Sequence, residues 1–292
     1  MRVGLLIAAA SACAAFCGCS STTTAGAVGA DRSQFLLVSA EDMNRGAASA
    51  YAQALGQARE KAALNVDPAQ TVRIRRIAAR LIPQTVVFRA DAPRWPWEVN
   101  VLSSSDVNAW CMPGGKIAVY TGILDQLKLT DDEAAAVMGH EIAHALREHS
   151  RERASQQAAS QALIGVAAAA VGLGGVGQSF AGTVARVTFE LPNSRLQETE
   201  ADRMGVELAA RAGFDPSAAI SLWQKMGRQG SGQKPPQILS THPSDETRMA
   251  DLAVYAQRVQ PLYESARALA TGTAAGASRA APGVRSGTLT HP

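Results

Sequence analysis

Apolar residues recur every three or four positions over much of the chain, which is the spacing of amphipathic helices. A capping pattern at Thr130 and Glu133 marks the start of the longest helix, and Gly213 follows the last turn of another. Pro83 follows a third and cannot continue it. The pattern predicts helices over residues 39–64, 68–81, 131–159, 196–212, 216–226 and 245–270.

A different pattern occupies residues 85–124, where short runs rich in β-branched and aromatic residues are bounded by Pro, Ser and Gly. The runs 85–88, 97–102 and 116–121 predict strands, and the Pro-Gly-Gly at 113–115 predicts the turn into the last one. We therefore expect an α+β fold, mainly helical, with a small antiparallel sheet.

The first residues predict an export signal. Arg2 precedes an apolar run over 3–16, which is shorter than the roughly 20 apolar residues needed to span a bilayer. Cys19, preceded by a glycine and followed by serines, resembles the lipidation site of bacterial lipoproteins, so residues 1–18 would be the signal peptide. Cys13 is an alternative lipidation site, and an ordinary signal peptide without a lipid is another reading.

Composition divides the remaining chain into three parts. Residues 19–38 are rich in Ser, Thr, Gly and Ala and predict a flexible tether after the lipid, residues 39–264 predict the folded domain, and residues 265–292 predict a disordered tail. Within the domain, the uncharged Gly- and Ala-rich stretch 162–177 predicts a mobile lid or a helix resting on a bilayer. Cys111 is expected to be a small buried hydrophobe.

The overall composition limits the classes of function. With 292 residues and 47% hydrophobic composition, the chain can bury a substantial core. The 28 basic and 25 acidic residues give a net charge of +3 without a long basic block. Fibrous and wholly disordered classes are therefore excluded, and nucleic acid is not an expected partner.

Residues 140–144 read HEIAH inside the capped helix. Positions four apart lie about one turn apart on the same helix face, so His140 and His144 can bind one metal ion. Glu141 flanks that face and can act as a base for the attacking water. Two nitrogen ligands, an open coordination position and a neighbouring base are what zinc hydrolysis requires. The alternative is a surface helix with two histidines, but the small and apolar neighbours favour a buried one.

A third ligand is expected on a helix that packs beside the first. The sequence ETEAD at 198–202 supplies Glu198 and Asp202 four positions apart on one face, whereas Glu200 is expected to point away. One of the paired carboxylates can bind the metal, and the other can accept the N–H of a ligating histidine. The alternative is an ordinary solvated acidic face.

Five short motifs then occur in a fixed order: NAW at 108–110, PGGKI at 113–117, HEIAH at 140–144, SR at 194–195 ahead of ETEAD, and THP at 241–243. Together they resemble the HtpX-, Oma-, BepA- and LoiP-like zinc metallopeptidases, gluzincins related to the Ste-type CAAX proteases, over about residues 55–251. The resemblance implies a zincin-like fold with the sheet beside the HExxH helix and one Zn²⁺ per chain. It implies these roles: His140, His144 and Glu198 as ligands, Glu141 as base, and Asp202 as the acid supporting a ligating histidine.

Two further histidines, His242 and His149, have roles that their sequence context indicates. His242, in the loop sequence ILSTHP, can hydrogen-bond the oxyanion of the reaction, occupy the open metal position at rest, or cap the following helix on the surface. His149 is about 140° round an ideal helix from His144, so it is expected to be solvated.

The expected substrate is an unfolded or misfolded protein. An extended segment can pair along a strand near Asn108, Gly114, Gly115 and Lys116, because main-chain pairing holds a peptide without demanding a sequence. The resemblance and the lipid together imply clearance of misfolded or misassembled envelope proteins by a lipoprotein that faces the periplasm, at the outer rather than the inner membrane. Two alternatives are a chaperone-like assembly factor with a structural or self-blocked zinc site and an enzyme that hydrolyses a cell-wall amide.

Overall fold

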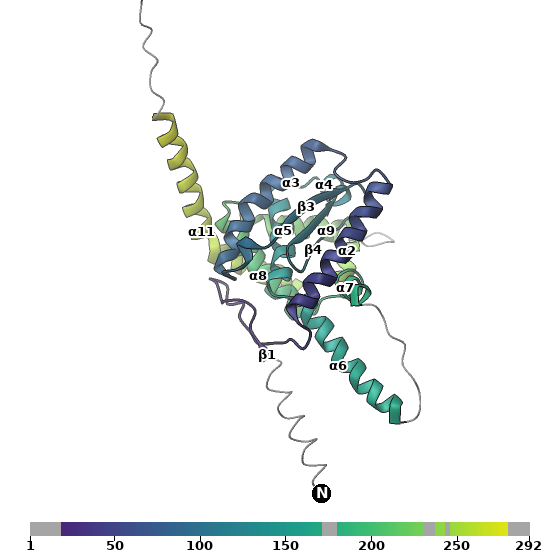
Figure 1. The fold of residues 1–292 in the computed structure, drawn as a ribbon. Helices are drawn as coiled ribbons and strands as arrows, with labels where there is room; N and C mark the ends of the chain where they lie inside the picture. Colours follow the sequence, from purple (N-terminus) through teal and green to yellow (C-terminus); the bar gives the residue numbers. More distant parts are fainter. Residues whose placement is uncertain (1–18, 171–179, 231–236, 243–245, 280–292) are drawn as a thin grey trace, which may run out of the picture.

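The computed structural model describes residues 19–170, 180–230, 237–242 and 246–279 (Figure 1). The helices are α2 (Ala40–Glu60), α3 (Pro68–Leu81), α4 (Thr121–Gln126), α5 (Asp131–Leu146), α6 (His149–Ala170), α7 (Phe180–Phe189), α8 (Arg195–Arg211), α9 (Ala218–Gly230), α10 (Gln237–Thr241) and α11 (Glu246–Arg279). The remaining elements are the 3₁₀ helices η1 (Ile82–Val87) and η2 (Ala92–Arg94) and the strands β1 (Cys19–Ser20), β2 (Gln34–Phe35), β3 (Glu98–Leu102), β4 (Ala109–Met112) and β5 (Lys116–Tyr120). The expectation of a mainly helical α+β fold is confirmed.

The central sheet has the strand order β3-β5-β4 and is mixed, not antiparallel as predicted. β4, a strand that the sequence analysis did not predict, and β5 form an antiparallel hairpin. Its turn lies at the predicted Pro-Gly-Gly and places Gly114 and Gly115 at positive φ. β3 pairs with the other edge of β5 and runs parallel to it. A hairpin turn is a local signal, whereas the pairing of β3 joins distant segments and leaves no mark in the sequence. The strand predicted over 85–88 is part of η1, which begins beside Pro83.

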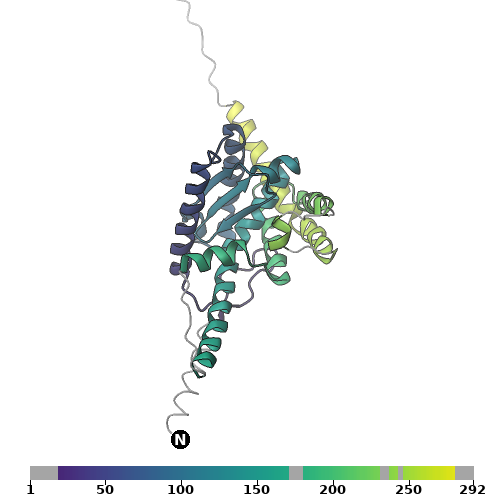
Figure 2. The same cartoon turned by 90° about the vertical axis from the view of Figure 1, so that its right-hand side faces the viewer.

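Both faces of the sheet are buried. Ala118, Met112 and Trp110 pack with residues of α2 on one face, whereas Ile117 and Val119 pack with residues of α3 and α5 on the other. Figure 2 shows this arrangement, with α2 along one side of the sheet and the C-terminal helices on the opposite side. The sheet thereby brings the edge of β4 against α5, the helix that carries HEIAH.

Helices α5 and α8 pack closely at two glycines. A Cβ added to Gly205 would lie 2.7 Å from the backbone nitrogen of His140, and one added to Gly139 would lie 2.8 Å from the carbonyl oxygen of Gly205. These are backbone atoms of two packed helices, so neither can easily move aside. The two glycines therefore set how near the acidic residues of α8 lie to the histidines of α5.

Gly205→Ala is expected to lower the free energy of unfolding by about 1–3 kcal/mol, the usual cost of overpacking. This loss should exceed the ~1 kcal/mol that alanine gains over glycine in a helix. Gly56→Ala on α2 is the matched control, because a Cβ there meets no described atom within 4 Å. Urea unfolding compares the two variants, and equal stability would contradict the close helix contact.

The long helix predicted over 131–159 is divided in two. The capping box of Thr130 and Glu133 starts α5 as expected, but α5 ends at Leu146 and α6 begins at His149. Glu148 has φ of 50°, a left-handed conformation that is uncommon for a residue other than glycine. Its carboxylate bonds to Arg89 and Arg151, which stabilises the break. No Gly or Pro marks this position, so the helical pattern alone could not reveal it.

The N-terminal segment 21–36 packs on the domain and is not the flexible tether predicted over 19–38. The Thr24 amide donates to the carbonyl of Phe88, Val28 is buried, and the Ala27 amide donates to the carboxylate of Glu207. Its small polar residues make specific hydrogen bonds, which composition alone does not report.

Three other predictions concern the tail, the signal peptide and the Gly- and Ala-rich stretch. Helix α11 continues through the start of the tail predicted from residue 265 and ends at Arg279, because Ala and Arg in this region favour helix. The signal peptide predicted over 1–18 and much of the stretch 162–177 lie outside the described residues. In the described parts of the chain, the helices are too short or too polar to be candidate membrane spans.

Candidate metal centre

Four side chains from three parts of the chain converge in the interior. His140 and His144 come from α5, Glu198 from α8, and His242 from the end of α10. One donor atom from each lies within 4.8 Å of all the others, and all four residues are buried. The three residues predicted as ligands are thus brought together, with His242 beside them.

The distances between donor atoms suit one small cation. Nε2 of His140 lies 3.0 Å from Nε2 of His144 and 3.4 Å from a carboxylate oxygen of Glu198. Nδ1 of His242 lies 3.1 Å from Nε2 of His140. A tetrahedral zinc ion with bonds of about 2.0–2.1 Å holds its ligand atoms roughly 3.3 Å apart. The three nitrogens and one carboxylate therefore fit zinc in both chemistry and spacing.

The ionisation of these groups also favours a cation. Burial alone would raise the pKa of Glu198, but His242 and the other histidines lower it well below its ordinary value, so it stays ionised. Burial lowers the pKa of His144 well below 6.5, so its ring is neutral, as ligation requires. Burial would also lower the pKa of His140, but the carboxylates of Asp202 and Glu198 outweigh it and raise it to about 9. The carboxylates thus draw positive charge to the cluster.

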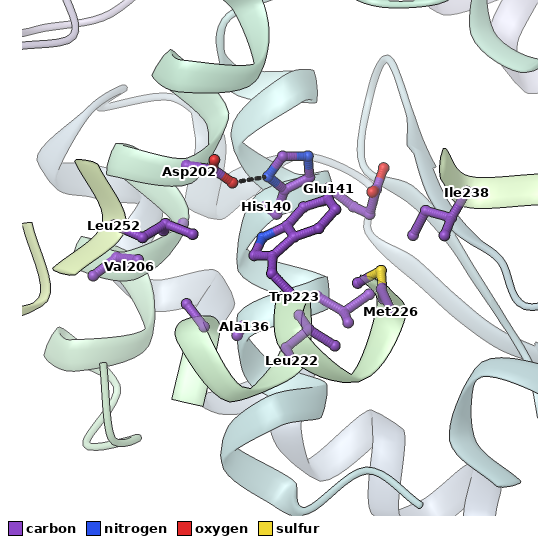
Figure 3. Close-up of a pocket in the computed structure, with 13 residues that line it drawn as sticks. Ala136, His140, Glu141, Asp202, Val206, Leu222, Trp223, Met226, Ile238 and Leu252 are labelled. Carbon is purple, nitrogen blue, oxygen red and sulfur yellow. Dashed lines mark hydrogen bonds and ion pairs between the residues drawn. The ribbon is translucent and has the colours of Figure 1, made fainter. Parts of the chain in front are cut away.

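Asp202 supports His140 from behind. Its Oδ1 lies 2.9 Å from Nδ1 of His140, the contact drawn as a dashed line in Figure 3. Nη2 of Arg248 lies 2.8 Å from both Asp202 Oδ1 and Glu198 Oε2, and its guanidinium packs 3.7 Å from the ring centre of Trp223. Because a carboxylate only accepts, Nδ1 of His140 carries a proton, and a cation bound at Nε2 would replace the second proton that the raised pKa implies.

The prediction that His149 is solvated is wrong, whereas Glu200 lies outside the donor cluster. His149 is 0% exposed, its Nδ1 lies 2.8 Å from Nδ1 of His144, and its Nε2 lies 3.1 Å from Oε2 of Glu200. Glu200 is also buried and pairs with Arg147 and Arg32. The break at Glu148 rotates His149 back toward His144, so the ideal helical angle between them does not apply.

Glu141 lies beside the cluster and leaves one oxygen available. Its Oε1 accepts no hydrogen bond from the described residues, and lies 3.5 Å from Nε2 of His242. Burial raises the pKa of Glu141 above 4.5, which brings it nearer to the range of an effective general base at neutral pH. The arrangement can therefore hold a water molecule near both Glu141 and the four donor atoms.

An apolar pocket adjoins Glu141 and His140 on the α9 side. Figure 3 shows Trp223 and Met226 of α9 together with Ile238 of α10 around the two site residues. The indole of Trp223 meets the His140 ring edge to face, with centres 6.0 Å apart. The apolar side chains lower the local polarity on this side, which strengthens electrostatic interactions in the site.

A second cavity opens from the cluster to the edge of β4. It is lined by Asn108, Trp110 and Cys111 as well as by Glu141, His144 and His242. Asn108 thus lies at the site as expected. Gly114, Gly115 and Lys116 do not line this cavity: the glycines form the hairpin turn, and Lys116 lies on the central strand with its amine bonded to Glu98 and Pro96.

The sequence did not predict three residues that contribute to the site: Arg248, Asn193 and His149. Arg248 pairs with Glu198 and Asp202. The backbone N–H of Asn193 donates a hydrogen bond to the carbonyl of Thr241, next to His242. His149 contacts the predicted ligand His144. The spacing of Arg248 and Asn193 from the motifs carries no helical or strand signal. For His149, the charged run at 147–149 after an apolar helix is the one local hint of a helix end.

Comparison with known proteins gives consistent matches. The chain matches the pattern of peptidase family M48 over residues 68–256. It is 33% identical over 236 residues to the mitochondrial metalloendopeptidase OMA1 of Schizosaccharomyces pombe, covering 80% of the chain and 67% of that protein. OMA1 of Arabidopsis thaliana is 38% identical over 160 residues, covering 54% and 31%. The beta-barrel assembly-enhancing protease of Escherichia coli K12 is 30% identical over 220 residues, covering 70% and 43%, so the chain spans less than half of the last two relatives.

Proposed function

The chain belongs to peptidase family M48, and on that premise we propose that it is a zinc-dependent endopeptidase that cleaves misfolded or misassembled envelope proteins. The observation that carries this proposal is the convergence of His140, His144 and Glu198 next to Glu141. Zinc is the ion proposed, because two imidazoles and one carboxylate with a neighbouring base are its usual catalytic ligand set.

Glu141, Asp202 and Arg248 have separate roles in the proposed reaction. Bound zinc would act as a Lewis acid toward the scissile carbonyl and lower the pKa of the attacking water to about 7. Glu141 takes the proton of that water and returns it to the leaving amine, for which its raised pKa suits it. Asp202 fixes the tautomer and orientation of His140, and Arg248 holds Asp202 and Glu198 in place.

The substrate edge proposed here is β4, rather than the longer stretch to Lys116. β5 is paired on both sides, whereas β4 pairs only with β5 in the described sheet. The cavity along Asn108 to Cys111 leads directly to Glu141. An extended peptide added to this edge would place its main chain beside the base, and unfolded segments can add in this way without a specific sequence.

His242 is proposed to occupy the fourth donor position at rest. Its Nδ1 lies among the donor atoms, 2.9 Å from Glu198 Oε1, which favours this role over capping a surface helix. A site with four protein donors is typical of structural zinc, and this observation supports the alternative of a non-catalytic, chaperone-like assembly factor. In the endopeptidase proposal, His242 swings away as substrate enters, and its ring is then available to bond the oxyanion.

The cellular setting is also a proposal. The export pattern and Cys19 support a lipoprotein of the bacterial envelope facing the periplasm, and the name of the Escherichia coli relative refers to β-barrel assembly. Ser20, the residue after Cys19, is exposed. Residues 39–264 hold the site residues, but the segment 21–36 packs as part of the same folded unit.

The full chain is expected to cleave an unfolded casein-type protein in the presence of zinc. A chelator should abolish cleavage, and added zinc should restore it, because the proposed site holds the only ion in the mechanism. A tightly folded protein is the substrate control and should stay intact, since it has no free strand for the β4 edge. Cleavage that continues unchanged after chelation would contradict the proposal.

A further inference from the structure

A buried polar network extends from His144 to the N-terminal segment. His144 contacts His149, His149 contacts Glu200, and Glu200 pairs with Arg147 and with Arg32. The two histidines and Glu200 are all buried. Of these residues only His144 has a role in the proposed zinc site. His149, Glu200, Arg147 and Arg32 have none so far.

The hydrogen-bond chemistry of the network allows one consistent arrangement of protons. If Nε2 of neutral His144 keeps its lone pair for a metal, Nδ1 of His144 must carry the proton. Nδ1 of His149, at 2.8 Å, must then accept, so His149 carries its proton on Nε2. That proton points at Oε2 of Glu200, 3.1 Å away, and an ionised carboxylate is a pure acceptor.

Glu200 is itself held by two cations. Nη2 of Arg147 lies 2.8 Å from its Oε1, and Nη2 of Arg32 lies 3.0 Å from its Oε2. Arg32 also makes two bonds with Glu152, at 2.7 and 2.8 Å. The carboxylate thus cannot rotate away from His149 without breaking buried ion pairs, which is costly in a protein interior.

The N-terminal segment closes the network from outside. The Arg147 guanidinium donates to the Thr23 hydroxyl at 2.9 Å and to the carbonyl of Arg32 at 3.2 Å. The Gln34 amide donates to the carbonyl of Arg147 at 2.6 Å. Residues shortly after the proposed lipidation site are therefore bonded to the same groups that support His144.

We propose that His149 and Glu200, held by Arg147 and by Arg32 of the N-terminal segment, are positioning residues that fix the tautomer and orientation of His144 for the metal. The inference rests on the proposed zinc site. It gives His144 a support equivalent to the one that Asp202 and Arg248 give His140, so both imidazoles are fixed independently. It also makes the N-terminal segment part of the metal site's framework.

The test is zinc affinity of the full chain, measured by competition with a chromophoric chelator. His149→Phe keeps a ring of similar size but can neither accept nor donate, and it should weaken zinc binding about 10–100-fold. His149→Gln can accept from His144 and donate to Glu200, so it should recover most of the affinity. Arg32→Met should weaken binding in the same direction by a smaller factor, because it acts through Glu200.

The outcomes are distinct. Wild-type affinity in His149→Phe, or a Gln variant as weak as the Phe variant, overturns the positioning role. A wild-type chain that binds no zinc overturns the proposed function together with this inference. If His149→Phe does not fold, ¹⁵N NMR of the wild-type histidines decides: protons on Nδ1 of His144 and Nε2 of His149 are expected, and the opposite tautomers refute it.

Discussion

Glu141→Gln is expected to reduce cleavage of an unfolded protein by about 10²–10⁴-fold, the usual contribution of a general base. The amide has the shape of the carboxylate but cannot take a proton from water. Its carbonyl oxygen can still occupy the position of Oε1 near His242, so the surrounding groups stay in place. The rate constant should fall more than KM changes, because the lost interaction belongs to the chemical step.

Zinc content and thermal unfolding are the controls for this variant. Glu141 is not among the four clustered donors, so both should match the wild type. An inactive but metal-loaded variant that also loses the proposed envelope function would support proteolysis as the biological activity. Full retention of envelope function would favour the chaperone-like alternative, and wild-type cleavage would refute Glu141 as the base.

Glu198→Gln is expected to weaken zinc binding by more than 100-fold, beyond the roughly 10–100-fold that loss of a supporting group costs. The substitution keeps the size of the side chain but removes the negative charge that faces His140, His144 and Arg248. Chelator competition measures the affinity, and cleavage at low zinc should fall in parallel. High zinc should restore part of the activity, because the amide oxygen is still a weak donor.

Glu190→Gln is the matched control, since the same chemical change occurs at an exposed position with a side-chain exposure of 71%. It should leave zinc affinity and cleavage unchanged. If Glu198→Gln behaved like this control, the carboxylate would not be a ligand. Loss of affinity in both variants would instead indicate a general effect of net charge.

The sequence predicted the elements whose signals are local. The capping box of α5 and the apolar spacing of α8 placed the starts of these helices within a residue of the observed ones. The Pro-Gly-Gly turn likewise marked the β4–β5 hairpin. The sequence did not predict the parallel pairing of β3, the helix break at Glu148, or the packing of segment 21–36, because each depends on contacts between distant residues.

The same division applies to the site. His140 and His144 follow from their spacing on one helix. The spacing of Glu198 and Asp202 on another indicates that one of them can bind the metal, and only the family resemblance assigns that role to Glu198. Arg248, Asn193 and His149 enter through tertiary contacts that have no sequence period. His149 is the clearest case, because an unbroken helix would have directed it to solvent.

One divalent ion is proposed to lie between His140, His144 and Glu198. Diffraction from crystals of the zinc-loaded chain, measured on both sides of the zinc absorption edge, tests it most directly. We expect one anomalous peak, within about 2.0–2.2 Å of Nε2 of each histidine and of an oxygen of Glu198. A peak elsewhere, or a peak bound to the histidines with the carboxylate of Glu198 turned away, would contradict it.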